Sequence, residues 1–261
     1  MNCAPFLQSV VAPICRFSQS EERITIEQIH GTGFFVTGFG HFLTARHVLE
    51  AALGDTERNG GMIAIFPMQI VNGIRRNMTA CPVGYDFADE PYDVAICKTL
   101  YDSPTFYKLQ EGGVEVWQDV ATIGYPVSAT FKGTEQFEVQ ARVHKGYIQR
   151  IVPRGRMRSG SHPDAYELSF AISHGMSGAP LFIHAGDYDR LIEICIGSIN
   201  SRIVDYESVI FEEGEVSMKE QIVRVEEFGV AHNIMNLLDW KPKCLDGLSL
   251  QDASNQYWRN P

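Results

Sequence analysis

The chain has 261 residues, of which 44% are hydrophobic, so it is long enough for one large all-β domain or two smaller ones with a sizeable core. Its 22 Lys and Arg residues are outnumbered by 32 Asp and Glu residues, which gives a net charge of −10. This balance argues against nucleic acid as a partner, because phosphate binding needs clustered basic residues. No run approaches roughly 18 consecutive apolar residues, which argues against a membrane-spanning helix.

The beginning of the chain and its cysteines predict a reduced, cytoplasmic protein. The first nine residues lack a basic stretch followed by a long apolar run, so no signal peptide is expected. Of the six cysteines, Cys97 and Cys195 lie inside apolar runs, which is typical of buried thiols. No Cys-x-x-Cys or His/Cys cluster has the spacing of a zinc site. We therefore expect neither a metal nor a cofactor.

The first part of the chain is predicted to consist of short strands around one helical turn. A hairpin over residues 31–49 is expected to deliver His47 into a helical turn over residues 45–52, followed by a loop over 53–62. Asn72-Gly73 suits a tight hairpin between two further strands. The expected strands span residues 9–17, 23–30, 62–71, 75–83 and 94–100.

After a connection over residues 101–115, the second part predicts many short strands separated by Gly, Pro and polar turns, which suits an all-β barrel or sandwich. The expected strands span residues 116–124, 137–143, 147–152, 166–172, 179–184 and 191–199. We expect the arginine-containing loop 153–164 to be solvated. An acidic excursion over 205–220 is either a solvated hairpin or an attractor of basic substrates. Residues 229–240 have apolar spacing at helical period and predict a helix, and 241–261 form a polar tail that either packs on the surface or binds a partner.

Ser177 lies between two glycines in the stretch Gly175-Met176-Ser177-Gly178. Such a turn could point the amides of Gly175 and Ser177 into one small space, which would form an oxyanion hole. A serine hydroxyl needs a base to become a nucleophile, and the base needs an orienting carboxylate. His47 is the candidate base.

Asp93 is the candidate carboxylate because the apolar residues 94–96 would bury it at the start of a strand. There it could hold a histidine ring in one tautomer. Three rivals precede it, Asp86, Asp89 and Glu90, and we expect these to be solvated loop charges.

Four segments in order, G-T-G-F-F-V, L-T-A-R-H-V, D-V-A-I and G-M-S-G-A-P, resemble those of trypsin-like serine peptidases, closest to the bacterial and intracellular branch that includes the high-temperature-requirement proteases. The resemblance covers about residues 5–240. It implies a chymotrypsin-like double β-barrel with a C-terminal helix. Residues 1–114 would carry His47 and Asp93, residues 115–240 would carry Ser177 and the helix, and 241–261 would be a tail. No cysteine flanks His47 or Ser177, where secreted relatives have theirs.

The resemblance implies a serine endopeptidase acting on protein or peptide substrates through His47, Asp93 and Ser177. It places the floor of the specificity pocket at Ala171 and its walls at Ser198, Asn200 and Gly229, with His174 positioned to contact substrate. Because Ala171 is not acidic, we expect small or medium apolar side chains at the cleaved bond and no preference for Lys or Arg.

Met176 departs from the secreted enzymes, which have an aspartate before the nucleophile that pairs with a new N-terminus after cleavage. We therefore expect a chain that is active as made or is switched by ordering of a loop. Two alternatives stay open: a catalytically silent binding module, and a protease that acts only when an activating or targeting partner engages it. An α/β-hydrolase is disfavoured because position 179 is Ala and the triad order differs.

Overall fold

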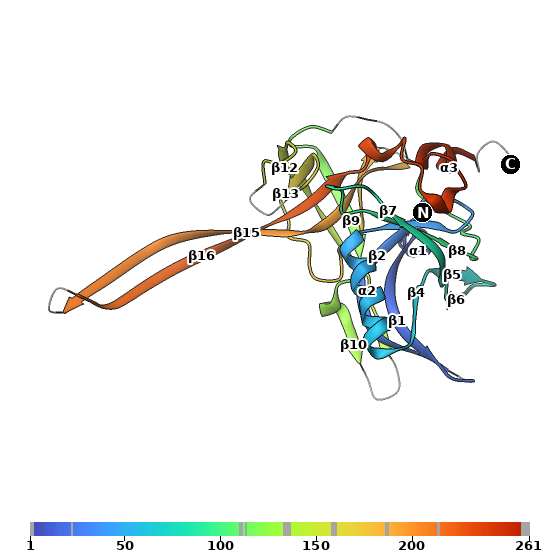
Figure 1. The fold of residues 1–261 in the computed structure, drawn as a ribbon, viewed down its shortest axis with the longest axis horizontal. Coiled ribbons are helices and arrows are strands. Elements are labelled where there is room, and N and C mark those ends of the chain that lie inside the picture. The colour runs from blue at the N-terminus through green and yellow to red at the C-terminus, as the bar shows by residue number, and fades with distance from the viewer. Residues whose placement is uncertain are drawn as a thin grey trace.

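The computed structural model describes residues 3–21, 23–109, 112, 114–132, 137–157, 161–185, 188–212 and 215–256. Two packed β-structures form the body, and a long two-stranded arm projects from it (Figure 1). The first half contains α1 (Cys3–Val10), β1 (Val11–Gln19), β2 (Ile24–Phe35), β3 (His41–Thr44), α2 (Arg46–Asn59), β4 (Met62–Ile65), β5 (Met68–Val71), β6 (Ile74–Asn77), β7 (Pro82–Phe87) and β8 (Ala95–Thr99).

The second half contains β9 (Asp119–Gly124), the 3₁₀ turn η1 (Val127–Ala129), β10 (Thr130–Lys132), β11 (Phe137–Val139), β12 (Arg142–Val152), β13 (Ala165–Leu168), β14 (Pro180–Ala185), β15 (Tyr188–Glu212), β16 (Glu215–Asn233), the 3₁₀ turns η2 (Met235–Leu237) and η3 (Lys243–Leu245), and α3 (Leu250–Gln256).

The first six-stranded sheet has the order β4-β1-β2-β3-β8-β7, and an antiparallel bridge between Ile65 and Ala80 draws its two ends together. Strands β12-β13-β16-β15-β14-β9 form a closed barrel. One apolar cluster is shared by the two halves: the ring of Tyr107 packs edge-on to Phe34 of β2 and stacks on Phe182 of β14. The prediction of an all-β, chymotrypsin-like double β-barrel is confirmed.

Helix α2 is longer than the sequence predicts. We expected the helical turn to end at residue 52 and a loop to follow, but the helix continues to Asn59. It ends where the amide of Gly60 donates to the carbonyl of Thr56. Val48, Leu49 and Ala52 form its buried face. By contrast, the hairpin at Asn72-Gly73 is confirmed, with φ values of 52° and 76° that suit a tight turn between β5 and β6.

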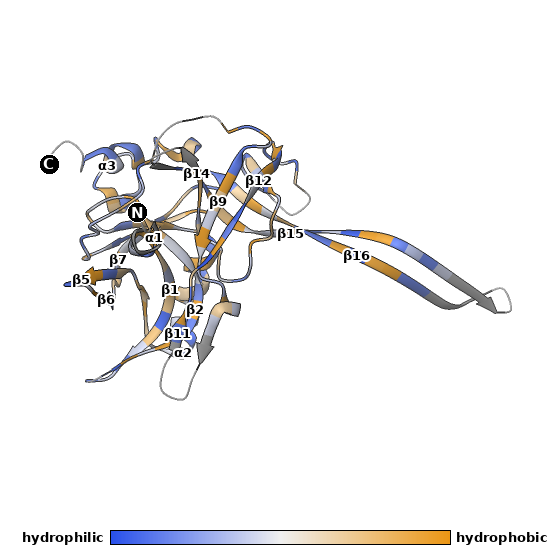
Figure 2. Ribbon diagram, turned by 180° about the vertical axis from the view of Figure 1, so that it is seen from behind, coloured by the Kyte–Doolittle hydropathy of each residue, from blue (hydrophilic) through white to orange (hydrophobic). Residues whose placement is uncertain are grey.

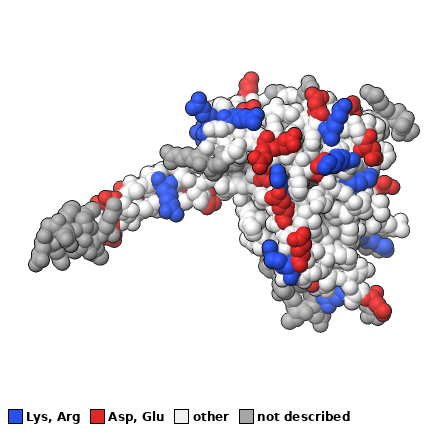
Figure 3. Space-filling model, in the orientation of Figure 1, with Lys and Arg blue, Asp and Glu red and all other residues white. Residues whose placement is uncertain are grey.

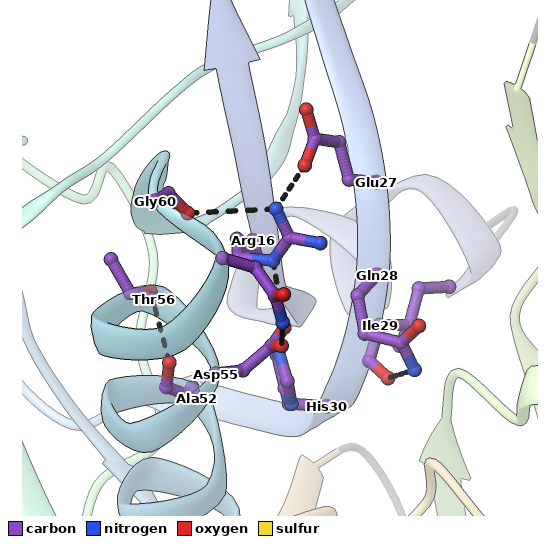
Figure 4. Close-up of polar contacts among 10 residues, drawn as sticks. Arg16, Glu27, Gln28, Ile29, His30, Ala52, Asp55, Thr56 and Gly60 are labelled. Carbon is purple, nitrogen blue, oxygen red and sulfur yellow. Dashed lines mark hydrogen bonds and ion pairs between the residues drawn. The ribbon is translucent and has the colours of Figure 1, made fainter.

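Four charged or ionisable side chains hold α2 against β1 and β2 (Figure 4). Nε of Arg16 donates to a carboxylate oxygen of Asp55 at 2.7 Å, and another guanidinium nitrogen bonds Glu27. Nε2 of His30 lies 3.1 Å from the same Asp55 oxygen. This cluster anchors the helix whose first turn carries His47.

A C-terminal helix is present, but it lies at Leu250–Gln256 and not at residues 229–240 as expected. Gly229–Asn233 continues β16 instead, because it is paired with β13 on one side and β15 on the other and is therefore mostly buried. Of the expected tail, residues up to 256 pack on the body: the amide of Lys243 donates to Asp86, and Ser254 Oγ accepts from the amide of Leu109. Residues 257–261 lie outside the described part.

The expected acidic excursion is the arm, which consists of β15 beyond Ile199 and β16 before Phe228 (Figure 1). Hydrophobic positions lie between hydrophilic ones on both of its strands (Figure 2). Five hydrophobic side chains of the arm are at least 40% exposed: Val204, Tyr206, Ile222, Val223 and Val225. The side chains of residues 209–219 lie outside the described part. The described remainder is largely solvent-exposed, so the arm adds little to the core.

Shortening the arm is expected to leave the body folded. Ile203 and Arg224 are directly paired, so an Asn-Gly turn can join them in place of residues 204–223. The melting temperature, followed by circular dichroism, is expected to stay within a few degrees of the wild-type value because no buried apolar side chain among the described residues is removed. Loss of a cooperative transition would contradict this.

Candidate active site

His47 and Asp93 lie together where α2 begins and where the chain enters β8. The Nδ1 atom of His47 is 2.6 Å from Oδ2 of Asp93, and the backbone amide of His47 donates to Oδ1 of the same carboxylate at 2.9 Å. The amide of Arg46 also donates to the carbonyl of Asp93. These contacts fix the carboxylate against the helix N-terminus. They leave Nε2 of His47 available, and the imidazole side chain is 48% exposed.

Burial alone would raise the pKa of Asp93, but the hydrogen bonds and charge of His47 outweigh that effect and hold the pKa below its usual value. The carboxylate is therefore ionised and can stabilise a protonated imidazole. Among the rivals, the side chain of Asp86 accepts from the amides of Phe87 and Lys243. Asp89 and Glu90 are exposed.

Ser177 lies in the turn between β13 and β14, facing the first half of the chain. Its carbonyl accepts from the amide of Thr32 on β2 at 2.9 Å. Its hydroxyl donates to the carbonyl of Ile196 on β15 at 2.7 Å. Within the described part of the chain, no hydrogen bond joins this hydroxyl to His47. The structure thus brings His47 and Asp93 into contact and leaves the Ser177 hydroxyl turned toward β15.

The backbone before Ser177 forms a turn that requires glycine. The amide of Met176 donates to the carbonyl of Ser173, and Gly175 has a φ of 94°, as position i+2 of a type II turn requires. The carbonyl of His174 accepts from the amide of Val127 at 2.9 Å. Because the C=O and N–H of a trans peptide point in opposite directions, the amide of Gly175 points away from Val127. Among the described residues, the amides of Gly175 and Ser177 have no hydrogen-bond acceptor.

Sequence reasoning missed Thr32, which links the two halves at this turn. Its hydroxyl donates to the carbonyl of Gly175 at 2.8 Å and accepts from the amide of Tyr125 at 3.0 Å. The side chain is fully buried. Thr32 lies inside the G-T-G-F-F-V segment, but its partner is 143 residues away along the chain, so no local pattern indicates the contact.

Replacing Thr32 with Val is expected to lower kcat/KM for any substrate about tenfold or more. The change leaves the carbonyl of Gly175 and the amide of Tyr125 buried without a partner, which costs about 1–3 kcal/mol for each group. Initial rates of peptide cleavage measure the effect. Thr32→Ser keeps the hydroxyl and serves as the matched control. Equal activity of wild type and Thr32→Val would contradict the assignment.

The residues expected to line the specificity pocket lie close to one another. Ser198 Oγ accepts from the amide of Ile172 at 2.7 Å, and the amide of Gly229 donates to the carbonyl of Phe170 at 2.8 Å. The segment containing Ala171 is therefore tied to β15 and β16. Ser198 also lines two hollows on the outside of the barrel, and Asn200 lines the larger one. His174 is exposed and occupies position i+1 of the turn between Ser173 and Met176.

His232 is a further histidine beside Asp93 that sequence reasoning treated as incidental. Its Nδ1 lies 3.4 Å from the amide nitrogen of Asp93, and burial lowers the pKa of the imidazole to about 4. It is therefore neutral at pH 7 and can accept that N–H. Among the described residues, no group of three or more His, Cys, Asp or Glu side chains is arranged to hold a metal ion.

In the comparison with known families, the family model of the trypsin-like peptidase domain matches residues 31–188. That range contains His47, Asp93 and Ser177. The comparison with curated proteins found no significant match. None of the helices in the described residues is long and apolar enough to cross a membrane.

Solved structures share the fold at low sequence identity. The HtrA-type protease AlgWS227A with decapeptide has a TM-score of 0.55 and 18% identity over 92% of this chain, which spans 65% of that protein's chain. The MamO protease domain from Magnetospirillum magneticum in its apo form has a TM-score of 0.53 and 13% identity, covering 88% of this chain and 94% of its own. Deg5 has a TM-score of 0.51 and 19% identity, and the match covers 75% of this chain and 84% of the Deg5 chain. At these identities the likeness shows the fold.

Proposed function

The chain belongs to the trypsin-like peptidase family, a family of serine proteases, and from that premise we propose that it hydrolyses peptide bonds through His47, Asp93 and Ser177. The contact between Nδ1 of His47 and Asp93 is the observation that carries the proposal, because it orients the imidazole and leaves Nε2 available as a base. Residues 1–114 would supply this pair, and residues 115–240 would supply the nucleophile.

In the proposed reaction, Ser177 Oγ attacks the peptide carbonyl while His47 Nε2 takes its proton. The carbon–nitrogen bond breaks as His47 returns that proton to the leaving amine. A water molecule then attacks the acyl carbon while His47 takes its proton. The ester bond to Ser177 breaks as His47 gives that proton to Ser177 Oγ, which releases the acid product. Asp93 stays ionised and stabilises the imidazolium, and the amides of Gly175 and Ser177 receive the oxyanion.

The Ser177 hydroxyl must turn from the Ile196 carbonyl toward His47 before it can react. Catalytic hydrogen bonds are often formed only in the substrate complex, so the contact with Ile196 is compatible with the proposed role. The turn that would hold the oxyanion is already supported by Thr32 and Val127. We therefore propose that the chain needs no N-terminal cleavage to form this site.

The substrate is proposed to be a protein or peptide with a small or medium apolar residue at the cleaved bond. Support comes from the hydrogen bond between Ser198 and Ile172, which leaves little width between the two segments expected to form the pocket. The five cysteines whose side chains are described are free, which supports a reducing compartment, and we propose the cytoplasm.

A mixture of peptides from denatured cellular proteins tests the proposal. Incubation with the purified chain is expected to give new peptide termini by mass spectrometry, and Ser177→Ala should give none. Retention of uncut peptides by both proteins, with no new termini, would favour the alternative of a silent binding module. Cleavage only after addition of a cell extract would favour a protease that requires a partner.

A further inference from the structure

A groove of about 990 Å³ lies along β15, on the outside of the barrel. We call it the basic groove; its lining includes Arg150, Arg156, Arg202, Glu167, Ser198 and Phe228. A second hollow of about 220 Å³ shares Met157, Ser198 and Ile199 with it. That hollow reaches Asp93 and Ile196, the residue whose carbonyl holds the Ser177 hydroxyl. The two hollows therefore lie side by side, one next to the candidate active site and the other next to the base of the arm.

The groove carries an excess of positive charge on a strongly acidic chain. Glu167 is paired with Arg150 at 2.6 Å. Arg156 and Arg202 are exposed and form no ion pair with any other described residue. The residue across from Arg202 is Val225, so no carboxylate directly opposes it on the same face of the arm. Lys and Arg side chains lie at the end of the body that carries β12 and β13, with Asp and Glu side chains beside them (Figure 3).

The backbone of β15 also favours an extended ligand along these two hollows. Its pairing with β14 ends at Ile194, and from Gly197 onward β16 is its one partner strand among the described residues. An extended peptide can follow such a free edge, with every second side chain facing the hollows. Arg202 lies six positions after Ile196, which is about 20 Å along an extended strand at about 3.3 Å per residue. Arg202 can therefore be reached by side chains four to six residues from the cleaved bond.

We propose that the basic groove binds acidic side chains of an extended peptide substrate, four to six residues from the cleaved bond, through Arg156 and Arg202. This rests on the proposed peptidase function and adds a determinant of substrate choice. It also gives a role to the loop over residues 153–164, which sequence reasoning treated as merely solvated; Arg158 of that loop lies outside the described residues. The carboxylates of the substrate would pair with the guanidinium groups of Arg156 and Arg202, whose positive charge Glu167 does not neutralise.

Matched fluorescein-labelled peptides test the proposal by binding and by cleavage. All peptides share a central alanine–valine segment. Each also carries a block of three Asp, three Asn or three Lys residues, four to six positions from that segment. The block lies on the amino side of the segment in one series and on its carboxyl side in the other. Affinity is read by fluorescence anisotropy with Ser177→Ala, and kcat/KM with the wild type. In one series, the Asp peptide is expected to bind about three- to tenfold more tightly than the Asn peptide, as two exposed ion pairs allow.

The double variant Arg156→Gln/Arg202→Gln is expected to remove that preference, whereas Arg58→Gln/Arg76→Gln, which loses the same charge outside the groove, should keep it. The preference should also shrink in 1 M salt. Equal affinity for Asp and Asn peptides in both series, or a preference that survives the groove variant, would overturn the proposal even if every peptide is cleaved. Failure of cleavage with the affinity pattern intact would instead overturn the peptidase function and leave the groove assignment standing.

Discussion

Replacing Asp93 with Asn is expected to lower kcat for peptide hydrolysis about 10⁴-fold, the size of effect known for this change in a Ser-His-Asp triad. Asp93 now receives a hydrogen bond from Nδ1 of His47 at 2.6 Å. In the variant, the side-chain amide can donate a hydrogen bond to Nδ1 of His47, so the proton of the neutral ring moves to Nε2. A protonated Nε2 cannot accept the proton of the Ser177 hydroxyl. His47→Ala and Ser177→Ala are expected to cost more, roughly 10⁶-fold.

Asp89→Asn is the matched control, because Asp89 is an exposed carboxylate on the same segment. Its kcat should equal that of the wild type, and the melting temperature of each variant should show that the fold is intact. If Asp93→Asn kept a third or more of the wild-type kcat in a folded protein, the role assigned to the carboxylate would be wrong.

The second large effect concerns Glu193, a fully buried carboxyl group on β15. Neither of its oxygens has a hydrogen-bond partner among the described residues, and burial raises its pKa well above the ordinary value of 4.5. The folded protein therefore keeps a proton that the unfolded chain releases. As pH rises above 4.5 toward the folded-state pKa, the unfolded chain binds fewer protons, and stability must fall.

Glu193→Gln is expected to remove this pH dependence. Wild type and variant should have similar free energies of unfolding below pH 4.5. Above it, the variant should gain about 1.4 kcal/mol relative to the wild type for each pH unit, until the folded-state pKa is reached. Urea denaturation at several pH values gives the difference, in which contributions of histidines common to both proteins cancel.

Glu57→Gln, an exposed position on α2, provides the comparison and should show no such trend. A difference between wild type and Glu193→Gln that stays constant from pH 4.5 to pH 8 would mean that the buried carboxyl is ionised or hydrogen-bonded in the folded protein. Either result would contradict the environment assigned to it.

The segments around His47, Asp93 and Ser177 could be predicted from the sequence because each residue lies in a local pattern of strand, turn and glycine. The contact between His47 and Asp93 follows from such patterns once the fold is known. The same holds for the Asn72-Gly73 hairpin, whose geometry depends on two adjacent residues.

Long-range contacts account for what could not be predicted. Thr32 supports the turn at Gly175 from another strand, and Arg16 holds Asp55 of α2 across 39 residues. The prediction of a helix at residues 229–240 is wrong for a related reason, because pairing with distant strands decides the structure of this segment. A strand buried between two neighbours carries apolar residues on both faces, and in a short segment that pattern can be mistaken for helical spacing.

The arm illustrates a different limit. Its glutamate-rich strands indicate a solvated segment, and only pairing over the whole length, from Asn200↔Glu227 to Glu212↔Glu215, makes it a continuous ribbon. The arginines of the basic groove are similarly scattered over β12, the following loop and β15. Their proximity depends on the barrel, so no sequence window contains them together.

Labelling with a fluorophosphonate tests most directly whether Ser177 is an activated nucleophile. The probe phosphonylates a serine hydroxyl that a base has activated and needs no peptide substrate. We expect the intact chain to be labelled once, at Ser177 as located by mass spectrometry, and expect Ser177→Ala and His47→Ala to remain unlabelled. A folded wild-type protein that takes up no probe, or takes it up equally after His47→Ala, would contradict the proposed catalytic site.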